Sequence, residues 1–273
     1  NIDNEKTMVS YEENRFHMVE NQIEPGGVDN QRLLDVFTRV PRELFLPKKY
    51  RPVACIDEDI SLPDGYFLIE PLILARMLHI AKLDESDIDE EVISNASITY
   101  LEGYLFDKEK AKKAFRLTGD IVKQSGTKLA LTLSDTFCVD RHRKDFLDLV
   151  NGSVDILFAN EDEIKSLYET DDFQKACDAV SQKCEIAAIT RSEKGSVIVN
   201  ADKRIEIKAV PPKELVDTTG AGDLFASGFL YGLTQGKNLV ECGNLGSITA
   251  AEIISHVGPR PQTSLAELIQ KAA

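Results

Sequence analysis

Short β-prone runs alternate with helical patterns from about residue 88 onward, and this alternation constrains the fold more than any other feature of the sequence. The β-prone runs cover residues 98–101, 128–133, 154–159 and 186–190, and helical patterns cover residues 108–124, 141–150 and 172–182. Strands that alternate with helices usually pair in parallel, because each crossover helix packs on a face of the sheet. We therefore expect an α/β fold in which helices cover both faces of the sheet.

Two further β-prone runs end the strand-rich part of the chain. Residues 195–199 and 204–207 are separated by the turn-forming residues 200–203, which predicts a hairpin at an edge of the sheet. The remaining sequence has apolar residues at helical spacing, which predicts helices over residues 224–233, 239–254 and 264–271.

The first part of the chain has a different pattern. Apolar residues recur at helical spacing, as in Phe16, Val19 and Ile23, and proline- and glycine-bearing turns separate them. An acidic run over residues 84–91 separates the two patterns and is predicted to be an exposed linker. We therefore expect a mainly helical segment over residues 1–87 and an α/β part over residues 88–273.

Composition narrows the possible partners. The net charge of −14 and the isoelectric point near 4.8 disfavour binding to nucleic acid or an anionic membrane, because both carry negative charge. An anionic small-molecule substrate would need a local positive site, such as a helix N-terminus or a metal. The five cysteines are scattered without a Cys-x-x-Cys pair, which favours reduced thiols and a cytoplasmic location. The oligomeric state stays open.

The strongest chemical signal is the string Asp-Thr-Thr-Gly-Ala-Gly-Asp at residues 217–223, directly before a helical pattern. Small residues at a helix start let backbone N–H groups approach a phosphate, and the helix dipole adds partial positive charge there. Asp223, at the end of this turn, could accept the proton of an attacking hydroxyl. The alternative is that Gly220, Ala221 and Gly222 only permit a tight turn and that Asp223 only caps the helix.

Asn160 and Glu163 form a second candidate site, because they directly follow the apolar run at residues 154–159. Ligands of open α/β sheets bind at the carboxyl ends of the strands, where these two side chains could position a metal and phosphates. Asparagine is also a good helix N-cap, and a glutamate three residues later completes a capping box. The residues alone leave both interpretations open.

The whole string at residues 217–223 resembles the signature of the PfkB (ribokinase-type) carbohydrate and nucleoside kinases. The phrases at residues 100–104, 134–137, 160–163 and 190–195 fall in the family's order, so the resemblance covers about residue 88 to the C-terminus and is closest to bacterial adenosine-kinase-like members. It implies that Asp223 is the catalytic base, that the amides of Gly220, Ala221 and Gly222 stabilise the transferring phosphoryl group, and that ATP and Mg²⁺ are required. It also implies that Asn160 and Glu163 position the metal.

The same resemblance implies an ATP-binding side lined by Thr190, Gly195 and Thr219. Ser192 stands where many members carry glycine, so the contact of that loop departs from the family pattern. Asn244 and Ser247 are candidates for approaching the adenine, and an uncontacted helix face is the equal alternative. His142, between two arginines, is predicted to lie on a solvated charged face.

Residues about 8–83 resemble a different family, the N-terminal segment of protein-L-isoaspartate O-methyltransferases, through the phrases at residues 18–23, 40–47 and 70–78. The glycine-rich loop that would bind S-adenosylmethionine does not follow. The substrate half and lid that the kinase family carries before the position of Tyr100 are also not visible. The sequence therefore predicts a kinase for a nucleoside or sugar hydroxyl, adenosine first, that lacks its specificity side. A catalytically incompetent nucleotide-binding or interaction protein is the alternative, and methyl transfer is a third.

Overall fold

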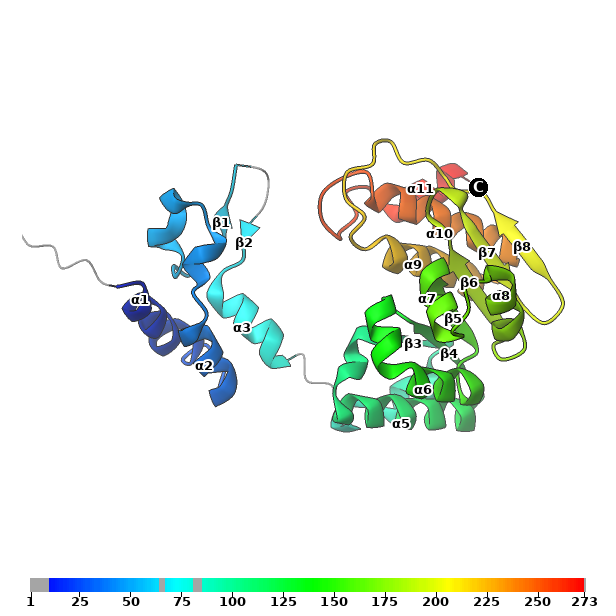
Figure 1. The fold of residues 1–273 in the computed structure, drawn as a ribbon, viewed down its shortest axis with the longest axis horizontal. Helices are drawn as coiled ribbons and strands as arrows, with labels where there is room; N and C mark the ends of the chain where they lie inside the picture. Colours follow the sequence, from blue (N-terminus) through cyan, green and yellow to red (C-terminus); the bar gives the residue numbers. More distant parts are fainter. Residues whose placement is uncertain (1–9, 64–66, 81–84, 273) are drawn as a thin grey trace, which may run out of the picture. The chain divides into compact units, whose positions relative to one another are not determined.

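The computed structural model describes residues 10–63, 67–80 and 85–272, and the chain separates into two compact units, Asn1–Lys82 and Leu83–Ala273 (Figure 1). The N-terminal unit contains helices α1 (Tyr11–Met18), α2 (Gln31–Arg39) and α3 (Pro71–Ile80), and the π-helical turn η1 (Val19–Ile23). Two 3₁₀ turns, η2 (Arg42–Phe45) and η3 (Lys48–Val53), precede the antiparallel strands β1 (Ile60–Ser61) and β2 (Phe67–Leu68). The predicted helical character of this segment is confirmed.

Local sequence explains why α1 starts where it does. Ser10 and Glu13 form a reciprocal capping box, in which each side chain accepts a hydrogen bond from the backbone N–H of the other. The core of this unit is apolar, but it also holds one buried ion pair, in which Arg15 Nη1 lies 2.6 Å from Glu43 Oε1. Among the described residues, no helix is long and apolar enough to cross a bilayer.

The second unit is built on a six-stranded sheet in the order β3-β4-β5-β6-β7-β8. Strands β3 (Ile98–Glu102), β4 (Lys128–Thr132), β5 (Ile156–Asn160) and β6 (Ile186–Thr190) run parallel. Strands β7 (Ser196–Val199) and β8 (Arg204–Ile207) pair antiparallel and form the edge hairpin. The predicted α/β class is therefore confirmed, and the sheet is mixed because of this hairpin.

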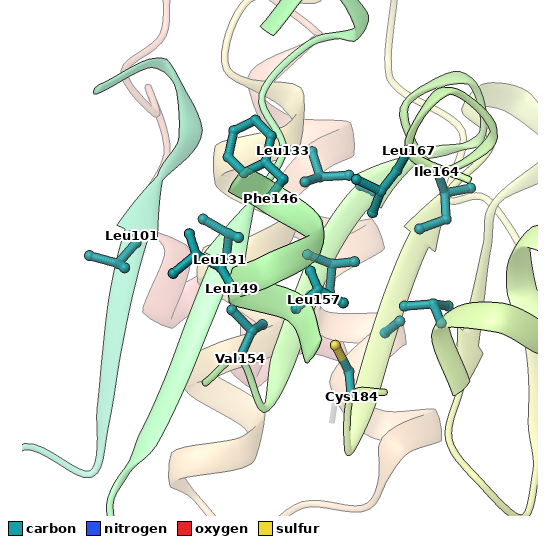
Figure 2. Packing of buried hydrophobic residues seen from close by; sticks show 14 of the residues in the cluster. Leu101, Leu131, Leu133, Phe146, Leu149, Val154, Leu157, Ile164, Leu167 and Cys184 are labelled. Atoms are coloured by element: carbon teal, nitrogen blue, oxygen red, sulfur yellow. The ribbon is translucent and has the colours of Figure 1, made fainter. Parts of the chain in front are cut away.

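Helices cover both faces of the sheet. Helices α5 (Glu109–Ser125), α6 (Thr136–Gly152), α7 (Glu161–Leu167) and α8 (Phe173–Ser181) share one core, to which β4 contributes Leu129 and Leu131 (Figure 2). Helices α9 (Ala221–Thr234) and α10 (Leu239–Ile253) share the other core, to which β4 contributes Ala130. This alternation follows from the period of two along a strand. The chain ends with α11 (Leu265–Ala272).

The acidic run is only partly a linker. Residues 85–87 form the 3₁₀ turn η4, and the side chain of Asp89 caps α4 (Glu90–Asn95). Glu90 and Glu91 lie exposed in the first turn of α4, where negative charge is favourable beside the helix N-terminus. Asp84 lies outside the described residues. The described residues of the run are therefore largely exposed as predicted, but they form a 3₁₀ turn and a helix start.

Glycines allow α9 and α10 to pack closely. A Cβ atom at Gly228 would lie 2.5 Å from Thr249 Oγ1 and 2.6 Å from the carbonyl oxygen of Leu245. The Thr249 hydroxyl in turn donates a hydrogen bond to the carbonyl oxygen of Leu224, 2.5 Å away, which ties the two helices together near the start of α9. The position of the α9 N-terminus therefore depends on this helix pair.

We expect Gly228→Ala to lower the free energy of unfolding by about 1–3 kcal/mol, because the added methyl group meets backbone that cannot move aside. Gly152→Ala is the matched control, since a Cβ there meets nothing within 4 Å. It should leave stability unchanged or raise it by a few tenths of a kcal/mol. Urea unfolding followed by circular dichroism measures both. Equal stability of the two variants would contradict the close packing of α9 on α10.

Candidate active site

The carboxyl ends of the parallel strands meet at one edge of the sheet. Glu102 at the end of β3 is the register partner of Thr132 on β4, and Asn160 at the end of β5 is the partner of Thr190 on β6. Asn160 and Thr190, two of the predicted site residues, are therefore neighbours across the β5–β6 ladder. In an open α/β sheet this edge is where ligands bind.

A carboxylate organises the turn before α9. Asp217 Oδ1 accepts hydrogen bonds from the backbone N–H of Thr219, at 2.9 Å, and from its hydroxyl, at 2.7 Å. Asp217 Oδ2 accepts a third from the N–H of Gly258, at 3.0 Å, which ties the turn to the loop after α10. These hydrogen bonds hold the pKa of Asp217 below its usual range. Asp217 therefore fixes the shape of the turn as an anion.

Gly220 caps α9 in a left-handed conformation, with φ of 82°. A residue with a Cβ would be strained there, so glycine is required. The amides of Gly222 and Asp223 belong to the first helical turn, whose N–H groups have no acceptor within the helix. A Cβ at Gly222 would meet nothing within 4 Å, whereas one at Gly220 would lie 3.3 Å from Pro259, so the turn is open beside Gly222. The start of α9 thus has the geometry of an anion-binding turn.

Asp223 is exposed in the first turn of α9. Burial, and after it the charge of Asp223, raise the pKa of Tyr100 on β3, and Glu102 and Glu163 act in the same direction. Tyr100 therefore lies within electrostatic range of all three carboxylates. The structure thus brings the aspartate of the glycine-rich turn to the same edge of the sheet as the Asn160 element.

Asn160 and Glu163 form a complete capping box at the start of α7. Asn160 Oδ1 accepts from the N–H of Glu163, at 2.8 Å, and Glu163 Oε2 accepts from the N–H of Asn160, at 2.9 Å. Asn160 Nδ2 also donates to Glu163 Oε1, at 2.5 Å. The structural alternative for this pair is therefore realised, and both carboxylate oxygens of Glu163 are engaged within the box.

Burial raises the pKa of Glu163 to about 7, although hydrogen bonds from Asn160 oppose the shift. Above this pH the folded state holds a buried anion. The contribution of the protonated Glu163 carboxyl to the free energy of unfolding is therefore fully present below pH 4.5 and is lost as the pH rises through 7. Glutamine does not titrate, so Glu163→Gln should gain stability relative to the wild type as the pH rises. We expect this difference in the free energy of unfolding to increase by roughly 3 kcal/mol between pH 4.5 and pH 8. Urea titrations at several pH values test this expectation.

Glu161, two residues earlier, provides a control of opposite sign. Its hydrogen bond with Arg191 lowers the pKa of Glu161, so its contribution to stability is present at neutral pH and lost as the pH falls. Glu161→Gln should therefore be less stable than the wild type at pH 7 and approach it in acid. The two variants showing the same pH dependence would contradict the opposite environments of these carboxyl groups.

The loop after β6 depends on two left-handed residues. Gly195 has φ of 86°, and a Cβ there would lie 2.0 Å from the carbonyl oxygen of Ile207 on β8, so glycine is needed for packing alone. Ser192 has φ of 52°. The backbone at Ser192 thus keeps a conformation that glycine adopts readily, although the residue itself departs from the family pattern.

The remaining predicted residues differ in how accessible their side chains are to a ligand. Asn244 is exposed on α10, whereas Ser247 is buried and its hydroxyl donates to the carbonyl oxygen of Gly243, at 3.0 Å. The Thr219 hydroxyl is exposed beside the turn and donates to Asp217. The prediction for His142 was wrong, because its side chain is only 12% exposed and lies 2.8 Å from Asp107.

Two features of this edge escaped the sequence analysis. Asp217 was not singled out, although a short acidic side chain bonding the N–H two residues on is a known turn pattern. At the end of β3, Glu102 accepts hydrogen bonds from the N–H of Tyr104 and the hydroxyl of Ser134, which joins the ends of β3 and β4. Ser134 has φ of 72°, a strained backbone conformation for a residue other than glycine, and no local sequence pattern predicts it.

Solved structures of kinases match the second unit. A probable sugar kinase from Rhizobium etli is 50% identical, with a TM-score of 0.69 over 70% of this chain and 58% of its own. The adenosine kinase of Sinorhizobium meliloti is 45% identical, with a TM-score of 0.69 over 71% of this chain and 59% of its own. A putative ribokinase II from E. coli, solved with ATP and Mg²⁺, is 18% identical with a TM-score of 0.64, and this likeness shows the fold alone.

The first unit has a separate relative. The protein-L-isoaspartate O-methyltransferase of Koribacter versatilis is 33% identical over 73 residues, which are 27% of this chain and 33% of that protein. Both resemblances inferred from the sequence are therefore confirmed, and the chain spans less than two thirds of the length of each of the Rhizobium etli, Sinorhizobium meliloti and Koribacter versatilis proteins. The model of the pfkB carbohydrate kinases matches residues 76–265, more than half of the sequence, so the chain belongs to the pfkB family of carbohydrate kinases.

Proposed function

We propose that the α/β unit transfers the γ-phosphoryl group of ATP to a primary hydroxyl of a nucleoside or sugar, with adenosine the first candidate. The observation that carries this proposal is the position of Asp223 in the first turn of α9, directly after the glycine-rich turn and within electrostatic range of Tyr100 on the neighbouring strand β3. The 45% identity to a solved adenosine kinase supports adenosine as the acceptor. The scattered unpaired thiols favour a cytoplasmic location.

In the proposed reaction the acceptor hydroxyl attacks the γ-phosphorus, and the bond to the bridging oxygen breaks to release ADP. Asp223 accepts the hydroxyl proton as the new oxygen–phosphorus bond forms. The amides of Gly220, Ala221 and Gly222 are assigned to stabilising the negative charge on the transferring group, which is the main demand of phosphoryl transfer. The N–H of Ala221 donates to the carbonyl oxygen of Thr218, 3.1 Å away, so it must share or exchange this acceptor to take part. ADP and a phosphate ester are the products, and Asp223 returns the proton to solvent.

The residues present fit Mg²⁺ held mainly by ATP phosphates and water. No group of three His, Cys, Asp or Glu residues within residues 10–63, 67–80 and 85–272 forms a metal cage. Mg²⁺ keeps several waters and often takes only one or two carboxylates beside the phosphates. Because Glu163 is engaged in the capping box, we assign Asn160 and Glu163 to orienting metal-bound water. When bound, the metal neutralises phosphate charge.

We expect Glu163→Gln to raise the Mg²⁺ concentration needed for half-maximal ATP turnover. Removing the anionic charge weakens attraction to a hard cation, while glutamine still serves in a capping box. A magnesium titration of ADP release measures the effect, and Glu161→Gln is the matched control from the same helical turn. An unchanged titration for Glu163→Gln would leave capping as the whole role of the pair.

The ATP-binding side is proposed to comprise Thr190, Gly195, Thr219 and Asn244. Thr190 lies directly beside Asn160 in the sheet, and Thr219 lies in the turn before the anion-binding amides. Asn244 is exposed and is the better placed of the two adenine candidates, because the Ser247 hydroxyl already donates to backbone within α10. We assign the buried Ser247 to packing behind the ATP-binding side and not to direct contact with the adenine.

Two observations favour a second function, nucleotide binding without transfer. The chain covers only 58% and 59% of the two most similar solved kinases described above, and Asp223 is exposed. The deciding experiment follows labelled γ-phosphate from ATP into a panel of nucleosides and sugars. Transfer of the γ-phosphate to any acceptor, or to water, supports the phosphoryl-transfer centre. Saturable ATP binding without transfer or hydrolysis supports the binding protein.

A further inference from the structure

Tyr100 on β3 packs, partly buried, in the core that α9 and α10 share with the sheet. Its neighbour Leu101 belongs to the core on the other face. The centroid of the Tyr100 ring lies 6.2 Å from that of Phe158 on β5. Phe225, two residues after Asp223 in α9, belongs to the same core as Tyr100. Packing therefore fixes the ring of Tyr100 in the layer that also holds the start of α9.

Thr132 connects this phenol to the end of β4. Tyr100 is the register partner of Ala130, so Thr132, two residues further along β4, lies diagonally opposite on the same face of the sheet. The side chain of Thr132 forms a hydrogen bond with the Tyr100 hydroxyl. Thr132 Oγ1 also accepts a hydrogen bond from the backbone N–H of Ser134, 3.4 Å away. The Thr132 hydroxyl therefore links Tyr100 to the left-handed residue that follows β4.

The direction of these hydrogen bonds leaves the proton of Tyr100 available. A hydroxyl oxygen accepts through its lone pairs but donates only one proton. Burial raises the pKa of Tyr100, and the hydrogen bond with Thr132 acts against this rise. A bond donated to the phenol oxygen has that effect, because it favours the anionic form. Thr132 is therefore the donor, and the Tyr100 hydroxyl keeps its own proton for another acceptor.

Asp223 is the acceptor that the site offers. After burial, the charges of three carboxylates raise the pKa of Tyr100, and Asp223 acts more strongly than Glu102 and Glu163. Glu102 and Glu163 already accept hydrogen bonds at both of their carboxylate oxygens. Within the described parts of the chain, no group donates a hydrogen bond to the side chain of Asp223. The carboxylate with the strongest effect on the phenol is thus the one that lacks a donor.

We propose that Tyr100 is a positioning residue for the base, and that its hydroxyl donates a hydrogen bond to the Asp223 carboxylate. This inference rests on the proposed function, in which Asp223 takes the proton of the attacking hydroxyl. An exposed carboxylate at a helix start can turn among rotamers, and a fixed donor selects the one in which its second oxygen faces the acceptor. Thr132 in turn holds the phenol. Tyr100 itself touches no reacting atom.

Removal of the phenol oxygen tests this role. Tyr100→Phe keeps the ring that packs on Phe158, so its thermal unfolding should match that of the wild type. Single-turnover release of γ-phosphate from labelled ATP, summed over acceptor and water, should slow by about 10- to 100-fold, the range of a hydrogen bond to a charged group. ATP affinity should stay unchanged.

Tyr168→Phe is the matched control for this change. The Tyr168 hydroxyl is buried without a hydrogen-bond partner among the described residues, so its loss breaks no contact. This variant should release γ-phosphate at the wild-type rate.

Two further comparisons test whether Tyr100 acts through Asp223. In a double-mutant cycle, Tyr100→Phe should have little further effect once Asp223→Asn has removed the base, because residues that act as a unit are not additive. Thr132→Val removes the hydrogen bond to the phenol and should slow release by less than Tyr100→Phe does. Thr132→Ser keeps the hydroxyl and should release phosphate faster than Thr132→Val.

The outcomes separate this inference from the function on which it rests. Slow release by Asp223→Asn with a wild-type rate for Tyr100→Phe would overturn the inference alone. The same holds for a lowered ATP affinity that accounts for the whole slowing, for equal slowing by Tyr100→Phe with and without Asp223, or for equal slowing by Tyr168→Phe. A wild type that releases no γ-phosphate, or an Asp223→Asn protein that releases it at the wild-type rate, would overturn the proposed function and this inference with it.

Discussion

Replacing Asp223 with asparagine is expected to lower the rate of γ-phosphoryl transfer by about 100- to 10,000-fold, the usual contribution of general-base catalysis. Asparagine keeps the size of the side chain but cannot accept the proton of an attacking hydroxyl. The exposed carboxylate lies in the first turn of α9, directly after the glycine-rich turn.

The measurement is single-turnover release of phosphate from γ-labelled ATP, summed over acceptor and water, with ATP affinity measured in parallel. ATP affinity should change little, because the amides of the turn remain. Asp217→Asn is the matched control, since it alters the carboxylate that holds the turn by three hydrogen bonds. That variant should weaken ATP binding. An Asp223→Asn protein that transfers phosphate at the wild-type rate would remove Asp223 from the role of base.

Much of the fold follows from local patterns in the sequence. The alternation of β-prone runs and helical patterns predicts β3 to β6 and their helices, because buried parallel strands read as short apolar runs. The turn-forming residues 200–203 likewise predict the β7–β8 hairpin, with both strands found within a residue of their expected limits. The resemblance at residues 217–223 predicts that a helix follows the glycine-rich turn, and α9 starts at Ala221.

Other features depend on contacts between residues far apart in the sequence. The prediction for His142 took its charged neighbours as a sign of exposure. The imidazole ring instead packs edge-to-face on Phe106, and the backbone of His142 departs from helical geometry. The nearness of Tyr100 to Asp223 arises only when β3 and α9 are placed around one sheet edge. No local pattern carries such a contact.

For Asn160 and Glu163 the sequence predicted two roles, of which the structure shows the capping box; the metal role stays a proposal. The capping box uses the carboxylate oxygens of Glu163 to hold its own helix start. The same box fixes the charge at the carboxyl end of β5, beside Thr190. A side chain locked in this way can orient metal-bound water, whereas direct coordination would require the box to open.

The chain alone is expected to phosphorylate adenosine slowly or not at all and to hydrolyse ATP in preference. Its phosphate-binding turn is complete within residues 217–223, so ATP can still be held. The acceptor is expected to have no comparable provision, because about two fifths of the length of each of the two matched kinases has no counterpart here and the loops around Asp223 expose apolar side chains. A hydroxyl that is not held in place forfeits proximity, which can account for about 7–11 kcal/mol of the barrier.

Water reaches an open site more readily than a closed one, so hydrolysis competes with transfer. The test measures ADP release and adenosine phosphorylation side by side, on protein whose intact mass matches the sequence. The complete 45%-identical adenosine kinase serves as the positive control. We expect ADP release by this chain to exceed adenosine phosphate formation. Saturable adenosine phosphorylation at about 1–100 per second, the ordinary range for kinases, would instead show that this chain already contains an acceptor site.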